Sequence, residues 1–123
     1  MGESTPWDVL ERTKVFALRI IRLYGALPKG VEAQVIGRQI LRSGTSVGAQ
    51  LREGKRSRSD AEMISKTEGA LQELEETVYW LELLADSGIV DRTKLEALMT
   101  EADELTAILV TGVITIKKRR KKR

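Results

Sequence analysis

The sequence predicts an all-α protein, folded as an antiparallel up-down-up-down four-helix bundle. Apolar residues recur three and four positions apart through four segments, the spacing that gathers side chains on one face of a helix. Pro, Gly and helix-capping residues separate these segments. Aromatic residues are only 4% of the 123 residues, so a core of Leu, Ile, Val and Ala is expected, which suits packed helices. We therefore expect one bundle domain at residues 1–116 and a disordered basic tail at residues 117–123.

The first helix is expected to begin at Thr5-Pro6, because Thr5 is a suitable N-cap and proline fits the first helical position. It is expected to stop at Leu27-Pro28, since proline disfavours a helical residue before it, and Gly30 follows. Its apolar residues cover a wide arc, as expected of a helix with more than one neighbour. The main stripe consists of Val9, Thr13, Phe16, Ile20, Leu23 and Leu27.

The second helix is expected from Val31 to a boundary at residues 55–59. Its middle, residues 43–48, is rich in Ser, Gly and Thr and would alone pass for a loop. We expect a continuous helix because the apolar residues stay in phase across this stretch, and so do the arginines on either side. The apolar face holds Ala33, Ile36, Ile40, Val47 and Leu51. Glycines beside this face, where a missing side chain lets another backbone approach closely, are Gly37, Gly44 and Gly48.

The third and fourth helices carry the three-four alternation most regularly. Ser59 and Glu62 have the spacing of a capping box, and Gly88 is a good terminator for the third helix. Asp91 is expected to cap the fourth. The third helix repeats apolar or small residues at Ile64, Thr67, Leu71, Leu74, Val78, Leu81 and Ala85, and the fourth at Leu95, Leu98, Ala102, Leu105, Leu109, Gly112 and Ile116. The β-branched run at residues 108–116 leaves a terminal strand as the alternative.

The composition excludes several kinds of chemistry. The chain has no cysteine and no histidine, which removes disulfides, thiolate sites, Cys nucleophiles and Ser-His-Asp triads. A di-iron carboxylate site, which bundles can hold, uses Glu-x-x-His pairs. We therefore expect a non-enzymatic protein with no metal and no cofactor. The N-terminus shows no signal-peptide pattern and no segment approaches 18 uninterrupted apolar residues, so a cytoplasmic location is expected.

The charge is strongly polarised along the chain. Residues 1–58 carry 11 Lys/Arg against five Asp/Glu, a net charge of +6, and residues 59–116 carry three against 13, a net charge of −10. The last seven residues add +7. A uniformly basic nucleic-acid binder would not show this pattern. Instead, the basic groups are expected to act from two places, the second helix and the tail.

Cations on the second helix form a row opposite its apolar face. At about 100° per residue, four arginines fall within roughly 80° of one another, and two further cations lie beside them. The row consists of Arg38, Arg42, Arg52 and Arg56, supported by Lys55 and Arg58. Such a row can bind successive phosphates of a nucleic acid. The alternative is pairing with the acidic second half, within or between subunits, through carboxylates such as Glu73, Glu76 and Glu82.

The tail is the second candidate contact. Runs of like charge commonly bind nucleic acid without sequence preference, and the alternative is non-specific stickiness. The tail consists of Lys117, Lys118, Arg119, Arg120, Lys121, Lys122 and Arg123. Tyr79 and Trp80 can stack on bases, but their place in the third helix favours half-buried packing. Trp7 is interpreted in the same way, or as a subunit contact.

Several motifs resemble the bacterial four helix bundle protein family, which includes proteins encoded in intervening sequences of 23S ribosomal RNA genes. The motifs are Leu27-Pro28-Lys29, the run from Arg42 to Ala49 (RSGTSVGA), Arg52-Glu53-Gly54 and the run from Leu71 to Thr77 (LQELEET). They are also similar to the accessory variability proteins of diversity-generating retroelements. The resemblance spans about residues 10–116. Gln50 departs from the asparagine usual at that position.

The resemblance implies a four-helix protomer that assembles into a barrel-like homopentamer with a basic surface. In the retroelement members it implies a reverse transcriptase and its template RNA as partners. We therefore expect a non-enzymatic RNA-binding accessory protein that contacts itself and an RNA or DNA backbone, and no membrane. The alternative is a structural or protein-interaction bundle of the intervening-sequence type, with no nucleic-acid role.

Overall fold

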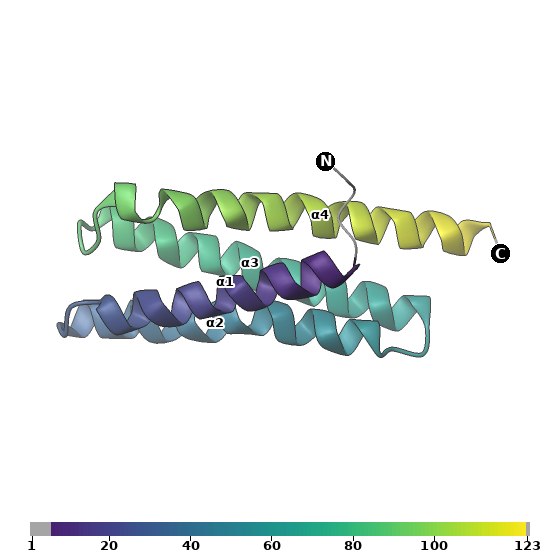
Figure 1. Ribbon diagram of the computed structural model, residues 1–123, viewed down its shortest axis with the longest axis horizontal. Coiled ribbons are helices and arrows are strands. Elements are labelled where there is room, and N and C mark those ends of the chain that lie inside the picture. Colours follow the sequence, from purple (N-terminus) through teal and green to yellow (C-terminus); the bar gives the residue numbers. More distant parts are fainter. Residues whose placement is uncertain (1–5, 123) are drawn as a thin grey trace.

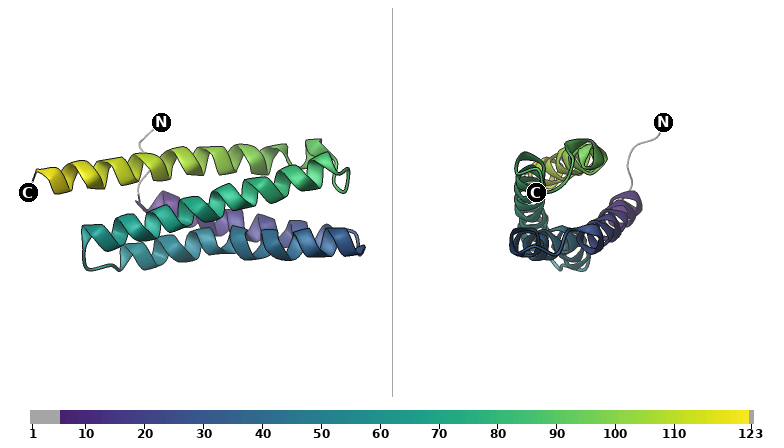
Figure 2. Two further views of the ribbon diagram at one scale, coloured as in Figure 1. Left: turned by 180° about the vertical axis from the view of Figure 1, so that it is seen from behind. Right: turned by 90° about the vertical axis from the view of Figure 1, so that its left-hand side faces the viewer.

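The computed structural model describes residues 6–122, with side chains from Val9 onward, and this part of the chain is helical throughout its regular structure. The elements are α1 (Pro6–Ala26), α2 (Val31–Lys55), α3 (Asp60–Asp86), the short 3₁₀ helix η1 (Arg92–Lys94) and α4 (Glu96–Lys121). Consecutive α-helices run antiparallel and follow one another around the bundle in chain order (Figures 1 and 2). The all-α, four-helix prediction is confirmed, and the alternative of a strand at residues 108–116 is wrong. The proposed cap Thr5 lies outside the described residues.

Helices α1 and α2 approach closely through glycines. A Cβ added at Gly44 would lie 2.8 Å from Cγ1 of Ile20, and one at Gly48 would lie 3.2 Å from Oγ1 of Thr13. At Gly37 it would meet Leu27 Cδ1 at 2.7 Å. The three glycines therefore leave room for buried residues of α1 and for Leu27 directly after it, as predicted from their position beside the apolar face.

The interface between α2 and α3 holds a buried polar pair within the apolar core. Ser43 and Thr77 are fully buried, and their hydroxyl oxygens lie 2.8 Å apart. Thr77 also donates to the Glu73 carbonyl, so both hydroxyls have partners. A buried hydroxyl that loses its hydrogen-bond partner destabilises the fold. Sliding α2 by one turn along α3 would separate Ser43 from Thr77 and leave both hydroxyls in this unfavourable state. The pair therefore fixes the register of α2 against α3.

The connection from α3 to α4 differs from the prediction. Gly88 adopts φ +79, the left-handed conformation that glycine accepts without strain, and this confirms it as the terminator. Asp91, however, does not cap α4. Its carboxylate accepts from the Thr93 amide at 3.0 Å and so caps η1. The helix α4 begins only at Glu96, after fully buried Leu95 has anchored the turn.

The predicted disordered tail requires correction for residues 117–121, which form the last turns of α4. Two physical reasons account for this. Val113 and Ile116 pack on Ile64 of α3, so the helix is already anchored just before the basic run begins. Lys and Arg are good helix formers and are favoured at the negative end of the helix dipole. Arg123 lies outside the described residues.

Helix α1 is held to α4 by one charged cluster. Arg12 donates from Nε and Nη2 to the two oxygens of Glu101, at 3.0 and 2.6 Å, and from Nη2 to Glu104 at 2.9 Å. These hydrogen bonds raise the pKa of Arg12, with the Glu101 bond as the largest cause. A two-oxygen contact of this kind fixes orientation as well as distance. It closes the bundle between its first and last helices.

Candidate nucleic-acid interface

The predicted arginine row lies along the outer surface of α2, and all four of its members are exposed. They are not equivalent. Arg42 donates to Glu73 at 3.4 Å and to Glu76 at 2.5 Å, both on α3. Arg38, Arg52 and Arg56 form no ion pair within the described part of the chain. The row is therefore split, with Arg42 engaged by the acidic helix and the others facing solvent.

Glu76 links Arg42 to the aromatic pair. Its Oε2 also accepts from Nε1 of Trp80 at 3.0 Å. Trp80 is half-buried against the core, whereas Tyr79 is 53% exposed and meets the Trp80 ring edge-on, with centroids 5.1 Å apart. The prediction of half-buried packing is therefore confirmed for Trp80 and wrong for Tyr79. The Trp7 side chain lies outside the described residues.

The ion pair of Glu76 with Arg42 predicts how the pKa of Glu76 responds to loss of Arg42. The Arg42 hydrogen bond, followed by the Trp80 bond, lowers the pKa of Glu76 below its ordinary value of 4.5. Because the folded-state pKa is depressed, the ion pair contributes stability above the unfolded pKa, and this contribution is lost as pH falls through the folded pKa. Carboxyl NMR titration should show the Glu76 pKa rising in Arg42→Gln. An unchanged pKa would contradict the ion pair.

The cations near the C-terminus of α2 and those of the last turns of α4 lie at one end of the bundle, named here the cationic end. Because α2 and α4 run in the same direction, the C-terminus of α2 and the C-terminus of α4 reach the same end, and the last turns of α4 extend past the α2–α3 turn (Figure 1). The cationic end consists of Arg52, Lys55, Arg56, Arg58, Lys117, Lys118, Arg119, Arg120, Lys121 and Lys122. The two cationic segments singled out in the sequence thus lie at the same end of the bundle.

Two ion pairs attach the end of α4 to α3. Arg119 contacts Asp60, with Nη2 to Oδ1 at 2.8 Å, and Lys117 Nζ lies 3.4 Å from Glu68. These pairs place the basic turns beside the start of α3, which directly follows the α2–α3 turn. The four cations contributed by α2 and this turn have no ion pair within the described residues, so their charge is uncompensated.

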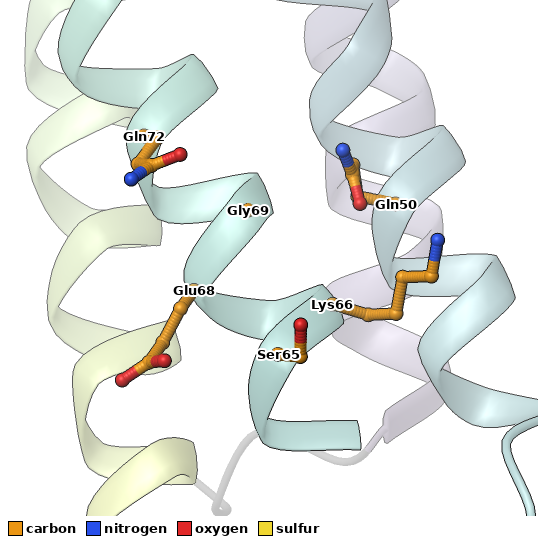
Figure 3. Close-up of a pocket in the computed structure, with 6 residues that line it drawn as sticks. All are labelled: Gln50, Ser65, Lys66, Glu68, Gly69 and Gln72. Atoms are coloured by element: carbon orange, nitrogen blue, oxygen red, sulfur yellow. The ribbon is translucent and has the colours of Figure 1, made fainter. Parts of the chain in front are cut away.

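A shallow polar groove of about 370 Å³ lies across α3, on the half of the bundle that ends in the cationic end. Its lining residues are Gln50, Ser65, Lys66, Glu68, Gly69 and Gln72 (Figure 3). Sequence reasoning missed this groove. The one signal in the sequence was Gln50, noted as a departure from the family pattern. The groove itself could not be predicted, because the spacing of residues on α3 does not show which α2 side chain lies beside Gly69.

Within residues 6–122 no group of three or more acidic side chains is arranged to hold a metal ion. The same part of the chain contains no helix with the length and apolar character needed to cross a membrane.

These features define a class, the antiparallel four-helix bundles with charged groups confined to the surface. The chain belongs to the 23S rRNA-intervening sequence protein family, whose pattern matches residues 6–111. The resemblance stated from the motifs is confirmed.

The fold is also similar to a crystal structure of a protein of unknown function from the S23 ribosomal protein family of Bacteroides thetaiotaomicron VPI-5482. The two chains are 38% identical, with a TM-score of 0.81, and the match covers 85% of this chain and 97% of the other. No curated protein matches the chain. Neither similarity indicates an enzymatic family.

Proposed function

We propose that this protein is a non-enzymatic accessory protein that binds RNA through the cationic end. The observation that carries the proposal is the convergence of two cationic segments, more than 50 residues apart in sequence, on one end of the bundle. Each unpaired cation can displace a counterion from a phosphate, and such contacts add affinity without reading sequence. Arg38, on the same face of α2, extends this surface along the bundle, whereas Arg42 would first have to leave Glu73 and Glu76.

In its narrower form the proposal concerns partners. The resemblance to retroelement accessory proteins supports a role in helping a reverse transcriptase engage its template RNA. The same resemblance supports a homopentamer, in which the cationic end would be repeated around a ring and weak contacts would become multivalent. Exposed apolar side chains along α1, namely Val15, Leu18 and Ile21, suit a surface that is covered by another chain.

The competing function is a structural or protein-interaction bundle whose charges pair between subunits. The ion pairs of Arg42 with α3 favour it, since they show that acidic α3 can neutralise basic α2. The two functions predict different responses to salt, because phosphate contacts release counterions and weaken in proportion to their number.

The test is the affinity of the intact chain for an RNA hairpin, measured across a salt series. We expect the logarithm of the association constant to fall linearly with the logarithm of the salt concentration, with a slope of several units, close to 0.9 for each duplex phosphate contact. A second chain carrying glutamine at positions 117–122 should keep part of this slope, since Arg52, Lys55, Arg56 and Arg58 remain. If this variant loses all binding, Arg52, Lys55, Arg56 and Arg58 do not bind RNA without the end of α4, and the joint surface proposed here is wrong. If the intact chain does not bind, nucleic-acid binding is excluded and the interaction-module function takes its place.

A further inference from the structure

Gly69 lies in the polar groove beside the cationic end, next to the Gln50 side chain. A Cβ at Gly69 would lie 3.0 Å from Oε1 of Gln50, which reaches across from α2 and lies above this point of α3 (Figure 3). The missing side chain of Gly69 therefore leaves room for the Gln50 amide, which packs against α3 at this point. A missing Cβ on one helix lets a side chain of the neighbouring helix approach its backbone closely.

The groove offers uncharged hydrogen-bonding groups. The side chains of Gln50, Ser65 and Gln72 form no hydrogen bond within the described part of the chain, so their donors and acceptors are available to a ligand. The two charged residues of the lining are already neutralised. Lys66 donates to Glu53 at 2.6 Å, and Glu68 accepts from Lys117 at 3.4 Å. The groove therefore favours a polar, neutral group over an ion.

The groove is continuous with the proposed phosphate-binding surface. Glu68, in the groove lining, accepts a hydrogen bond from Lys117, the first residue of the basic turns of α4, so the groove adjoins the α4 part of the cationic end. A strand whose phosphates lie on the cationic end would place its sugars beside this groove. In nucleic acids the neutral group that both donates and accepts a hydrogen bond, and that is carried by every ribose, is the 2′-hydroxyl.

We infer that the groove of Gln50, Ser65 and Gln72 contacts ribose 2′-hydroxyls and makes the protein prefer RNA to DNA. Amide and hydroxyl side chains match a group that donates and accepts at once. Deoxyribose offers these side chains no partner. The inference rests on the proposed nucleic-acid binding and extends it from phosphate contacts, which RNA and DNA share, to the group in which they differ.

The experiment compares three hairpins of one sequence, made of RNA, of DNA and of 2′-fluoro RNA, which lacks the hydroxyl donor. The wild-type chain should bind RNA about three- to tenfold more tightly than the other two, the factor expected for one net hydrogen bond. Gln50→Leu removes the amide. Gly69→Ala displaces it, and because alanine is the better helix former the fold is not put at risk. Both variants should lose the preference by weakening RNA binding alone. Gln39→Leu, at an exposed glutamine elsewhere on α2, is the matched control and should keep it.

Each other outcome has a distinct meaning. Equal affinity of the wild-type chain for the three hairpins overturns the inference and leaves phosphate binding intact. A preference for RNA that survives both Gln50→Leu and Gly69→Ala overturns the assignment to this groove. A preference lost equally in Gln39→Leu also overturns it. Failure to bind any of the hairpins overturns the proposed function itself.

Discussion

Gly44→Ala is expected to lower the free energy of unfolding by up to about 2 kcal/mol. The new Cβ would lie 2.8 Å from Cγ1 and 3.2 Å from Cβ of Ile20, which is fully buried and branched and so cannot turn aside. Overpacking of this kind costs about 1–3 kcal/mol, and the better helix propensity of alanine offsets about 1 kcal/mol of it. Thermal unfolding at fixed protein concentration should show a midpoint lowered by roughly 5 °C.

The matched control is Gly112→Ala in α4. Nothing lies within 4 Å of the added Cβ, so only helix propensity acts, and the variant should be more stable by about 0.5–1 kcal/mol. Opposite signs for the same substitution would show that the close approach of α1 and α2 at Ile20 decides the outcome. Two stabilising changes would mean that the helices do not touch at Gly44.

The sequence predicted the four helices well because each is long enough for the apolar period to outweigh local preference. Residues 43–48 of α2 are the clearest example. Hydroxyls of Thr45 and Ser46 bond back to carbonyls one turn earlier, at 2.7 Å, and so support the helix that their propensity disfavours. The helical spacing of Ile40 and Val47, both fully buried, was a more reliable signal than the low helix propensity of the residues between them.

The predicted seam of α3 was shifted by part of a turn. Ala70, Thr77 and Leu84 are fully buried, whereas Leu71, Val78 and Ala85 are half-buried. The reason is that α3 has two neighbours and turns its centre toward α2, where small residues allow the closest packing. A search for apolar residues overlooks Thr77, which can be buried because its hydroxyl is hydrogen-bonded to Ser43 and to the Glu73 carbonyl of its own helix.

The sequence predicted which residues belong to the candidate site but not how they are arranged in space. The spacing identified the arginines and the tail as separate segments, yet it could not show that Arg42 would pair with Glu76, since this depends on how α3 is rotated. The convergence of the two segments at one end follows from the antiparallel topology. The helical end of α4 follows from its packing on Ile64, a long-range contact.

Replacing Arg52, Lys55, Arg56 and Arg58 together by glutamine is expected to weaken RNA binding by at least about 100-fold near 0.1 M salt. Four lost phosphate contacts should also lower the salt slope by about 3–4 units on a duplex. The fold should survive, because these side chains are exposed and unpaired within the described residues and only a modest helix-dipole interaction is lost. Filter binding or fluorescence anisotropy across a salt series measures both quantities.

A control of equal charge separates a defined surface from general attraction. Four exposed cations outside the cationic end, replaced by glutamine, change the net charge by the same amount; they are Lys14, Arg22, Lys29 and Lys94. If the cationic end is the binding surface, this control keeps most of its affinity, because a phosphate contact acts at short range under screening. Equal losses in both variants would attribute binding to net charge alone. Dissociation of an oligomer in the first variant, seen by sedimentation, would instead assign these four cations to pairing between subunits.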